Sequence, residues 1–292
     1  MPISFRRKPG PPTTRSMVVD GRTLRIDVRP GTGGRPPLLL VNGVGASLEL
    51  LQPFVDALDP ALEVIRFDAP GVGGSPLPGL PYRFSGLCRL MARLLSELGH
   101  DEADVLGISW GGGVAQHFAL FHRHRCRRLV LVATGTGSLM VPARPWVLAR
   151  MVTPRRYLDR SYLRRNAADL YGGSARSQPD RVSTLMHAEN RVGPALGYVY
   201  QLAAGAGWTS LPFLPLIRQP TLILSGDDDP LIPLANARLM HSLIRRSQLH
   251  VYHGGHLGLV TEADELAPAV GRFLAAGPPA GDGRAAHNGP PG

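Results

Sequence analysis

Residues 103–113 read Ala-Asp-Val-Leu-Gly-Ile-Ser-Trp-Gly-Gly-Gly, and they carry the strongest structural signal in the sequence. It predicts a buried strand over residues 103–108 and a helix over residues 111–121, joined by a Gly-x-Ser-x-Gly turn. A serine on such a turn exposes its hydroxyl at the C-terminal edge of a sheet, and the flanking glycines let the strand and helix backbones approach closely. Ser109 is therefore the candidate nucleophile. Gly112 and Gly113 extend the pattern beyond that of an ordinary glycine-rich turn.

Strands and helices alternate on both sides of this turn. Strands are expected at residues 17–28 (a hairpin that turns at Asp20-Gly21), 37–41, 63–67, 103–108, 128–133, 220–225 and 248–252. Helices are expected at residues 48–58, 84–98, 111–121, 234–244 and 257–274. This order predicts an α/β fold with a mostly parallel, eight-stranded sheet that is covered by helices on both faces.

The alternation stops over residues 138–217, where helical patches are mixed with several prolines and many aromatic residues, and it then resumes. We interpret this stretch as a helical cap inserted after the sixth strand. The chain is then divided into a flexible N-terminal segment (1–16), a core (17–137 and 218–276), the cap and a disordered tail (277–292).

A serine hydroxyl is a weak nucleophile near neutral pH, so it needs a base, and the base needs an orienting carboxylate. The Gly-x-Ser-x-Gly turn is typical of α/β-hydrolases, in which the acid and the base follow the serine in that order. Three aspartates lie in Gly-Asp-Asp-Asp-Pro-Leu-Ile-Pro at residues 226–233. Asp229 fits the hydrolase pattern best, Asp228 is the alternative acid, and Asp227 is interpreted as a turn or capping residue. A metal site is disfavoured because no fixed ligand spacing accompanies the triplet.

The candidate base follows the last expected strand, in Gly-Gly-His-Leu at residues 254–257. Active sites of open α/β sheets collect beyond the C-terminal ends of the strands. His256 lies at such a position, directly before the final helix. His250 lies within the strand and His253 lies before the tip of the loop, so both are poorer candidates.

Two backbone N–H groups are expected to bind the oxyanion of the reaction. One belongs to Trp110, directly after the serine. The other is assigned to Val44, because the strand at residues 37–41 leads into Asn-Gly-Val-Gly at residues 42–45. This is similar to a His-Gly-x-Gly loop with Asn42 in place of histidine. The glycine-rich loop at residues 68–75 lacks dinucleotide-binding spacing and is interpreted as structural.

Composition and charge exclude several classes of protein. Two cysteines in 292 residues exclude a disulfide scaffold and a four-cysteine zinc site. No apolar run is long enough to span a membrane, and the N-terminus lacks the apolar region of a secretory signal. The expected location is therefore the cytoplasm. The net charge of +10 is compatible with nucleic-acid binding, but no aromatic–basic RNA motif or helix-turn-helix signature supports such a partner.

The chain resembles the α/β-hydrolases and, more specifically, the intracellular poly(3-hydroxyalkanoate) depolymerases that act on medium-chain-length polyesters. The resemblance covers about residues 22–274 and is carried by VNGVGASLELLQPF, FDAPGVGGS, GISWGG and GDDDPLIP, and by the cap stretches TPRRY, LYGG and AGWTS. It implies that Ser109 is the nucleophile, Asp229 the acid and His256 the base of a serine ester hydrolase. It implies no metal or organic cofactor. A small-molecule carboxylesterase, a thioesterase or a carbon–carbon bond hydrolase of the same fold is the alternative.

The basic excess is regional. Residues 1–16 contain four basic and no acidic residues, and residues 138–217 contain ten arginines and four acidic residues, so the rest of the chain is neutral. The expected cap is also rich in methionine, tyrosine and tryptophan, which suits an adaptable apolar lid for acyl chains. We hypothesise that the positive charge helps to dock the cap side on an anionic polyester granule, an attraction that salt would weaken.

Overall fold

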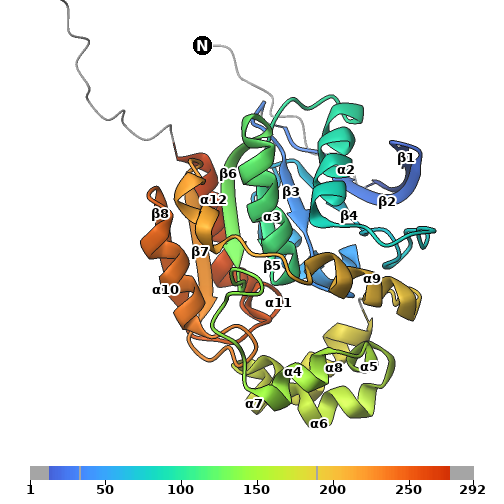
Figure 1. The fold of residues 1–292 in the computed structure, drawn as a ribbon, viewed down its shortest axis with the longest axis vertical. Helices are drawn as coiled ribbons and strands as arrows, with labels where there is room; N and C mark the ends of the chain where they lie inside the picture. The colour runs from blue at the N-terminus through green and yellow to red at the C-terminus, as the bar shows by residue number, and fades with distance from the viewer. Residues whose placement is uncertain (1–12, 33, 189, 277–292) are drawn as a thin grey trace, which may run out of the picture.

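The computed structural model describes residues 13–32, 34–188 and 190–276. Within these ranges, eight strands form one sheet in the order β1-β2-β4-β3-β5-β6-β7-β8 (Figure 1). The strands are β1 Thr13–Val19, β2 Arg22–Arg29, β3 Leu38–Val41, β4 Val64–Phe67, β5 Ala103–Ile108, β6 Cys126–Val132, β7 Thr221–Gly226 and β8 Ser247–Tyr252. β2 pairs antiparallel with β1 and β4, and the other neighbours are parallel. The expected mostly parallel sheet is confirmed.

The helices follow the expected alternation, with two differences. The α-helices are α1 Gln52–Ala57, α2 Phe84–Glu97, α3 Trp110–Phe121, α4 Pro145–Met151, α5 Arg155–Leu158, α6 Arg160–Tyr171, α7 Ser174–Ser177, α8 Pro179–Ala188, α9 Ala195–Gly205, α10 Leu234–Leu243, α11 Gly258–Thr261 and α12 Ala263–Ala275, and the 3-10 helices are η1 Leu48–Leu51, η2 Arg123–Arg125 and η3 Leu211–Leu216. The helix expected at residues 48–58 begins as η1, and the helix expected at residues 257–274 is divided at Glu262. None of the described helices is long and apolar enough to cross a bilayer.

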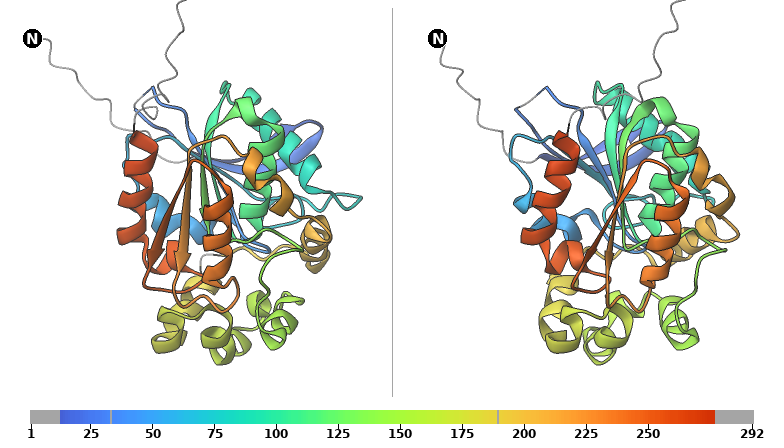
Figure 2. Two further views of the ribbon diagram at one scale, coloured as in Figure 1. Left: turned by 60° about the vertical axis from the view of Figure 1, so that its left-hand side comes forward. Right: turned by 90° about the vertical axis from the view of Figure 1, so that its left-hand side faces the viewer.

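Apolar side chains cover both faces of the sheet because successive residues of a strand point to opposite faces. Leu38 and Leu40 of β3 belong to the buried cluster that includes α1 and α12. Leu39 and Val105 belong to the cluster that includes α2, α3 and α10. Figure 2 shows α12 on one side of the sheet and α3 and α10 on the other. This double cover explains why the central strands are continuous apolar runs.

The first strand corrects the expected N-terminal boundary. Residues 13–16 were expected in the flexible segment, but they belong to β1 and pair with β2 from Thr13↔Val28 to Ser16↔Arg25. Their polar composition suits an edge strand, whose side chains face solvent while its backbone forms ladder hydrogen bonds. Thr14 adds a side-chain hydrogen bond of 2.7 Å to Asp27. The remaining residues of that segment and the expected tail lie outside the described residues.

The insertion between β6 and β7 contains α4 to α9 and η3. Figure 1 shows α4 to α8 grouped at one end of the molecule, with α9 between them and the sheet. The backbone N–H of His256 donates to the carbonyl oxygen of Tyr171 on α6 at 2.7 Å, and the N–H of Gly173 donates to Asp228 at 2.8 Å. The insertion therefore covers the loops that follow β7 and β8. Its treatment as a separate cap domain over residues 138–217 stays a prediction.

Candidate active site

Ser109 lies on a strained turn between β5 and α3. Its φ of 54° and ψ of −120° are unusual for a residue with a side chain, and such strain persists only where the surroundings hold it. The N–H of Ser109 donates to the carbonyl oxygen of Val132 at 2.9 Å, and its own carbonyl oxygen accepts from Thr134 Oγ1 at 2.7 Å. Hydrogen bonds from β6 and the loop after it therefore hold the sharp turn.

Two glycines allow the strand and the helix to cross at this turn. A Cβ on Gly107 would lie 2.2 Å from the carbonyl oxygen of Gly111, and a Cβ on Gly111 would lie 2.2 Å from that of Val41. No side chain fits at either distance. The start of α3 therefore packs directly against the ends of β3 and β5, which is the close approach that the Gly-x-Ser-x-Gly pattern predicts.

His256 and Asp229 form a buried pair. Nδ1 of His256 lies 2.8 Å from Oδ2 of Asp229, and both residues are buried. The other carboxylate oxygen accepts the N–H groups of Leu231 at 2.9 Å and Ile232 at 2.8 Å. These two bonds fix the rotation of the carboxylate, so Oδ2 faces the imidazole. A carboxylate at Nδ1 favours the tautomer with its proton on Nδ1, which leaves Nε2 free to accept a proton.

Asp228, the alternative acid, faces the cap rather than His256. Its carboxylate accepts from Nε of Arg176 at 2.6 Å and from Nη2 at 2.7 Å, and also from the N–H of Gly173. The hydrogen-bonded guanidinium of Arg176 lowers the pKa of Asp228 below its ordinary value. Asp228 therefore joins α7 and the loop before it to the loop after β7.

Asp227 lies at the surface and supports the neighbouring loop. Oδ1 accepts the N–H of Gly254 at 3.1 Å, and Oδ2 lies 3.0 Å from Nδ1 of the exposed His253. This contact lowers the pKa of Asp227 and raises the pKa of His253. These contacts agree with the interpretation of Asp227 as a turn residue, because they connect the loop after β7 to the loop that carries His256.

The loop at residues 42–45 lies beside Ser109. A Cβ on Gly43 would be 3.6 Å from Cβ of Ser109. Oδ1 of Asn42 accepts the N–H of Gly43 at 3.1 Å, so this side chain folds back on its own loop. Trp110 is the first residue of α3, a position where the backbone N–H has no acceptor within the helix. The structure therefore brings the loop that contains Val44 and the start of α3 to the same serine.

The glycine-rich loop after β4 is built around Asp68. The carboxylate of this buried residue accepts the N–H groups of Leu48 at 2.7 Å and Gly74 at 2.8 Å, and it pairs with Arg25 at 3.1 Å. Burial raises the pKa of Asp68. The loop therefore has the structural role that its spacing indicates. Across the described ranges, no three His, Cys, Asp or Glu side chains are grouped as ligands for a metal ion.

Several buried cap residues hydrogen-bond to the loop at residues 42–45, and the sequence indicates this contact for none of them. Oε1 of Gln201 accepts the N–H of Gly45 at 2.6 Å, and Nη2 of Arg156 donates to the carbonyl oxygen of Val44 at 3.1 Å. Arg156 lies in the stretch TPRRY, which was singled out only for its resemblance. No pattern in the sequence indicated Gln201.

Comparison with known proteins gives the family and agrees with the fold. A family model described as alpha/beta hydrolase fold matches residues 36–263. The chain is 50% identical over 267 residues to the poly(3-hydroxyalkanoate) depolymerase of Ectopseudomonas oleovorans, covering 91% of this chain and 94% of that protein. It is 27% identical over 242 residues to 3-oxoadipate enol-lactonase 2 of Acinetobacter baylyi, covering 82% and 89%. The crystal structure of the enol-lactonase from Burkholderia xenovorans LB400 shares the fold with a TM-score of 0.78 at 23% identity, over 90% of this chain and 100% of that one.

Proposed function

The chain belongs to the α/β-hydrolase family, and from this premise we propose that it is a serine ester hydrolase that cleaves poly(3-hydroxyalkanoate) polyester. The observation that carries the substrate class is the 50% identity to the poly(3-hydroxyalkanoate) depolymerase of E. oleovorans over 91% of the chain. The pair of His256 and Asp229, with Ser109 on its strained turn, supports the reaction type. The products are 3-hydroxyacyl monomers or oligomers, and no cofactor is needed.

The reaction proceeds through an acyl-enzyme. Oγ of Ser109 attacks the ester carbonyl carbon while Nε2 of His256 takes the hydroxyl proton. His256 then gives this proton to the leaving alcohol as the ester C–O bond breaks, and the 3-hydroxyacyl group stays on Ser109. A water molecule, deprotonated by His256, releases the acid and restores the serine. Asp229 keeps the imidazole in the correct tautomer and stabilises its protonated form.

The negative oxygen that develops in each step is bound by the backbone N–H groups of Val44 and Trp110. The support for this assignment is the position of the loop at residues 42–45, whose Gly43 lies beside Ser109. Such donors stabilise the transition state more than the ground state, and loss of one typically lowers kcat by about 10²- to 10³-fold.

The second candidate function is hydrolysis of a small substrate by a carboxylesterase, a thioesterase or a carbon–carbon bond hydrolase. The 27% identity to 3-oxoadipate enol-lactonase 2 of A. baylyi favours it, but this identity is lower and covers less of the chain. The test compares turnover of polyester granules with short and medium side chains against turnover of p-nitrophenyl and CoA esters. Preferential release of 3-hydroxy acids from polyester supports the depolymerase, and turnover of the small esters alone supports the alternative.

Replacing the nucleophile tests the reaction type itself. Ser109→Ala removes the attacking hydroxyl, so ester hydrolysis and covalent labelling by a fluorophosphonate should both disappear. The melting temperature should stay within a few degrees of wild type, because the turn is held by backbone groups. Activity close to wild type in this variant would contradict the mechanism.

We also propose that the protein works in the cytoplasm with the cap side on the granule surface. Of the sixteen exposed large apolar side chains in the described residues, eleven lie within residues 138–217. They are Leu139, Val141, Trp146, Leu148, Val152, Leu158, Val192, Leu196, Val199, Phe213 and Leu216. The ten arginines of the same stretch add positive charge. Apolar and cationic groups together suit a lipid- or protein-coated anionic surface. Granule binding that does not weaken with salt would contradict the electrostatic part.

A further inference from the structure

Three buried side chains of the cap hold one peptide group of the core. Nη2 of Arg156 and the hydroxyl of Tyr157 donate to the carbonyl oxygen of Val44 at 3.1 and 2.8 Å. On the other side of the same peptide, the N–H of Gly45 donates to Oε1 of Gln201 at 2.6 Å. The three cap residues are 2%, 6% and 1% exposed. Both polar atoms of the peptide are therefore hydrogen-bonded to buried side chains of the cap.

Arg156 is a buried cation with neutral partners. Its Nη1 donates to the hydroxyl of Tyr198 at 2.7 Å, and its guanidinium carbon lies 4.5 Å from the ring centroid of Tyr157 and 5.3 Å from that of Tyr198. No carboxylate of the described residues pairs with it. Burial of a charge is costly, and cap packing alone would be served as well by an apolar side chain. The guanidinium donates a charged hydrogen bond to the carbonyl oxygen of Val44, which an apolar side chain could not do.

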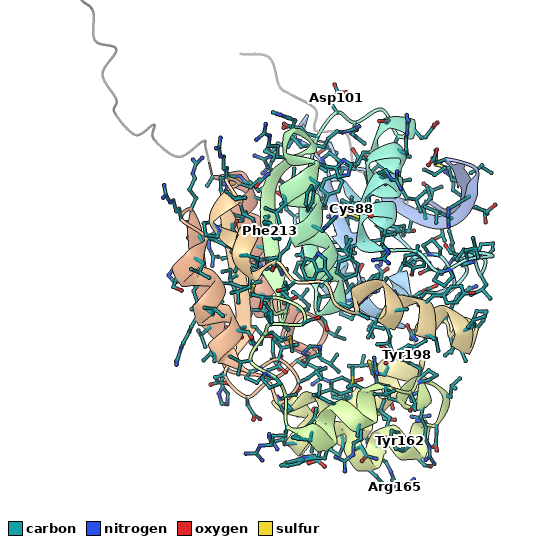
Figure 3. All side chains as sticks on the ribbon, in the orientation of Figure 1. Cys88, Asp101, Tyr162, Arg165, Tyr198 and Phe213 are labelled. Atoms are coloured by element: carbon teal, nitrogen blue, oxygen red, sulfur yellow. The ribbon has the colours of Figure 1, made fainter. Side chains whose placement is uncertain are left out.

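Gln201 also reaches the start of α3. Its backbone carbonyl oxygen accepts from Nε1 of Trp110 at 2.8 Å, while its side chain binds Gly45. One residue of α9 therefore contacts the residue after the nucleophile and the loop that lies beside it. Figure 3 shows Tyr198, on the same helix, between the sheet and helix α6, which carries Tyr162 and Arg165.

We propose that Arg156, Tyr157 and Gln201 are positioning residues for the oxyanion hole. The peptide that they hold follows Val44 directly, so its orientation restricts the backbone of Val44 and with it the direction of the Val44 N–H. The indole bond to Gln201 restricts Trp110, which carries the second donor. This inference rests on the proposed function, in which these two N–H groups bind the oxyanion.

The experiment compares two variants of Gln201 with a matched control. Gln201→Met removes the acceptor at nearly constant length, and Gln201→Glu keeps an acceptor oxygen. Gln219→Met is the control, because Gln219 is another buried glutamine whose Nε2 donates to the carbonyl oxygen of Ala119 near the C-terminal end of α3, away from the serine. With a soluble p-nitrophenyl ester, Gln201→Met should lower kcat by about 10- to 100-fold and change KM by less than about twofold. Gln201→Glu should recover part of the loss, and Gln219→Met should keep wild-type kcat.

A trifluoromethyl ketone, which forms an oxyanion with the serine, supplies a second readout. Its affinity for Gln201→Met should fall by about the same factor as kcat/KM, because both report binding of the oxyanion. If Gln201→Met does not fold, Tyr157→Phe replaces it, since this change deletes a single hydroxyl. Unchanged kcat and ketone affinity in a folded variant would overturn the proposal. Failure of the wild-type protein to hydrolyse any ester or to react with a fluorophosphonate would instead overturn the proposed function.

Discussion

Asparagine in place of Asp229 is an informative change, because the structure determines which atom of the new side chain faces His256. Oδ1 of Asp229 accepts two backbone N–H groups, from Leu231 and Ile232. An NH₂ group in that place would face two donors, so the amide oxygen must occupy it. The NH₂ group of Asp229→Asn then faces Nδ1 of His256, which accepts from it and carries its proton on Nε2.

The size of the effect follows from these contacts. A proton on Nε2 of His256 blocks acceptance of the Ser109 proton, and a change of this kind lowers kcat by about 10⁴-fold in Ser-His-Asp enzymes. The variant could regain the productive tautomer only by flipping its amide, which leaves two backbone donors unpaired at a cost of about 1–3 kcal/mol each. The flipped amide is therefore at least about 2 kcal/mol less stable than the unflipped one. If the variant reacts only through the flipped amide, kcat falls by at least about 30-fold, because about 1.4 kcal/mol corresponds to a factor of ten.

The assay is the initial rate of p-nitrophenyl ester hydrolysis at saturating substrate, with melting temperatures measured in parallel. Asp228→Asn is the matched control, because it neutralises the adjacent carboxylate, whose partners are Arg176, in a half-exposed ion pair, and the N–H of Gly173, and it leaves an amide oxygen that can still accept hydrogen bonds. Such pairs contribute about 0–1 kcal/mol, so this variant should keep kcat within a few-fold of wild type. Retention of more than about a tenth of wild-type kcat by Asp229→Asn, or a larger loss of activity in Asp228→Asn than in Asp229→Asn, would contradict the role of Asp229 as the orienting acid.

Three further predictions concern stability. Gly107→Ala places a methyl group 2.2 Å from the carbonyl oxygen of Gly111, so the free energy of unfolding should fall by about 3 kcal/mol or more, measured by urea denaturation. Arg66→Met leaves the buried Asp27 without its ion pair of 2.6 Å, and the same measurement should show a loss of about 3–5 kcal/mol. Burial raises the pKa of Asp104 to about 6, so the folded state holds this proton more tightly than the unfolded state. This group's contribution to stability should therefore fall as the pH rises from about 4 to 6, and Asp104→Asn should flatten that part of the stability profile.

The outcomes that contradict these predictions are equally concrete. A urea midpoint for Gly107→Ala close to wild type would mean that the strand and helix can separate without cost. Wild-type stability in Arg66→Met would mean that Asp27 is neutral or finds another partner. If the free energy of unfolding of Asp104→Asn changes between pH 4 and 6 as steeply as that of the wild type, other groups cause that pH dependence.

The sheet was predictable from the sequence because the central strands are buried on both faces and read as apolar runs between turn residues. The runs at residues 37–41, 103–108 and 220–225 lie on β3, β5 and β7. The sequence pointed to the candidate serine, acid and base for a related reason. Ser109 directly follows β5, Asp229 and His256 lie in the loops after β7 and β8, and parallel strands end at one edge of the sheet. The sequence left Asp228 as an alternative acid, whereas the structure shows that Asp229 is the aspartate in contact with His256.

The cap residues that contact the loop at residues 42–45 were not predictable, because their partners lie far away in the sequence. Gln201 binds the N–H of Gly45 across 156 positions, and Arg156 binds Val44 across 112. An arginine next to another arginine also has the composition of a solvated helix face, and nothing local shows that Arg156 alone is buried. The edge strand was missed over residues 13–16 for a similar reason, because its stability comes from pairing with β2 rather than from apolar side chains.

The cap hydrogen-bonds to three separate loops of the core, through Tyr171 to His256, through Arg176 to Asp228 and through Gln201 to Gly45. A cap that swung away as a rigid lid would break all three connections in one movement. We therefore expect that any cap movement large enough to break these hydrogen bonds would also disturb the loops that carry His256 and Val44, so that substrate entry and the alignment of the proposed site would be coupled.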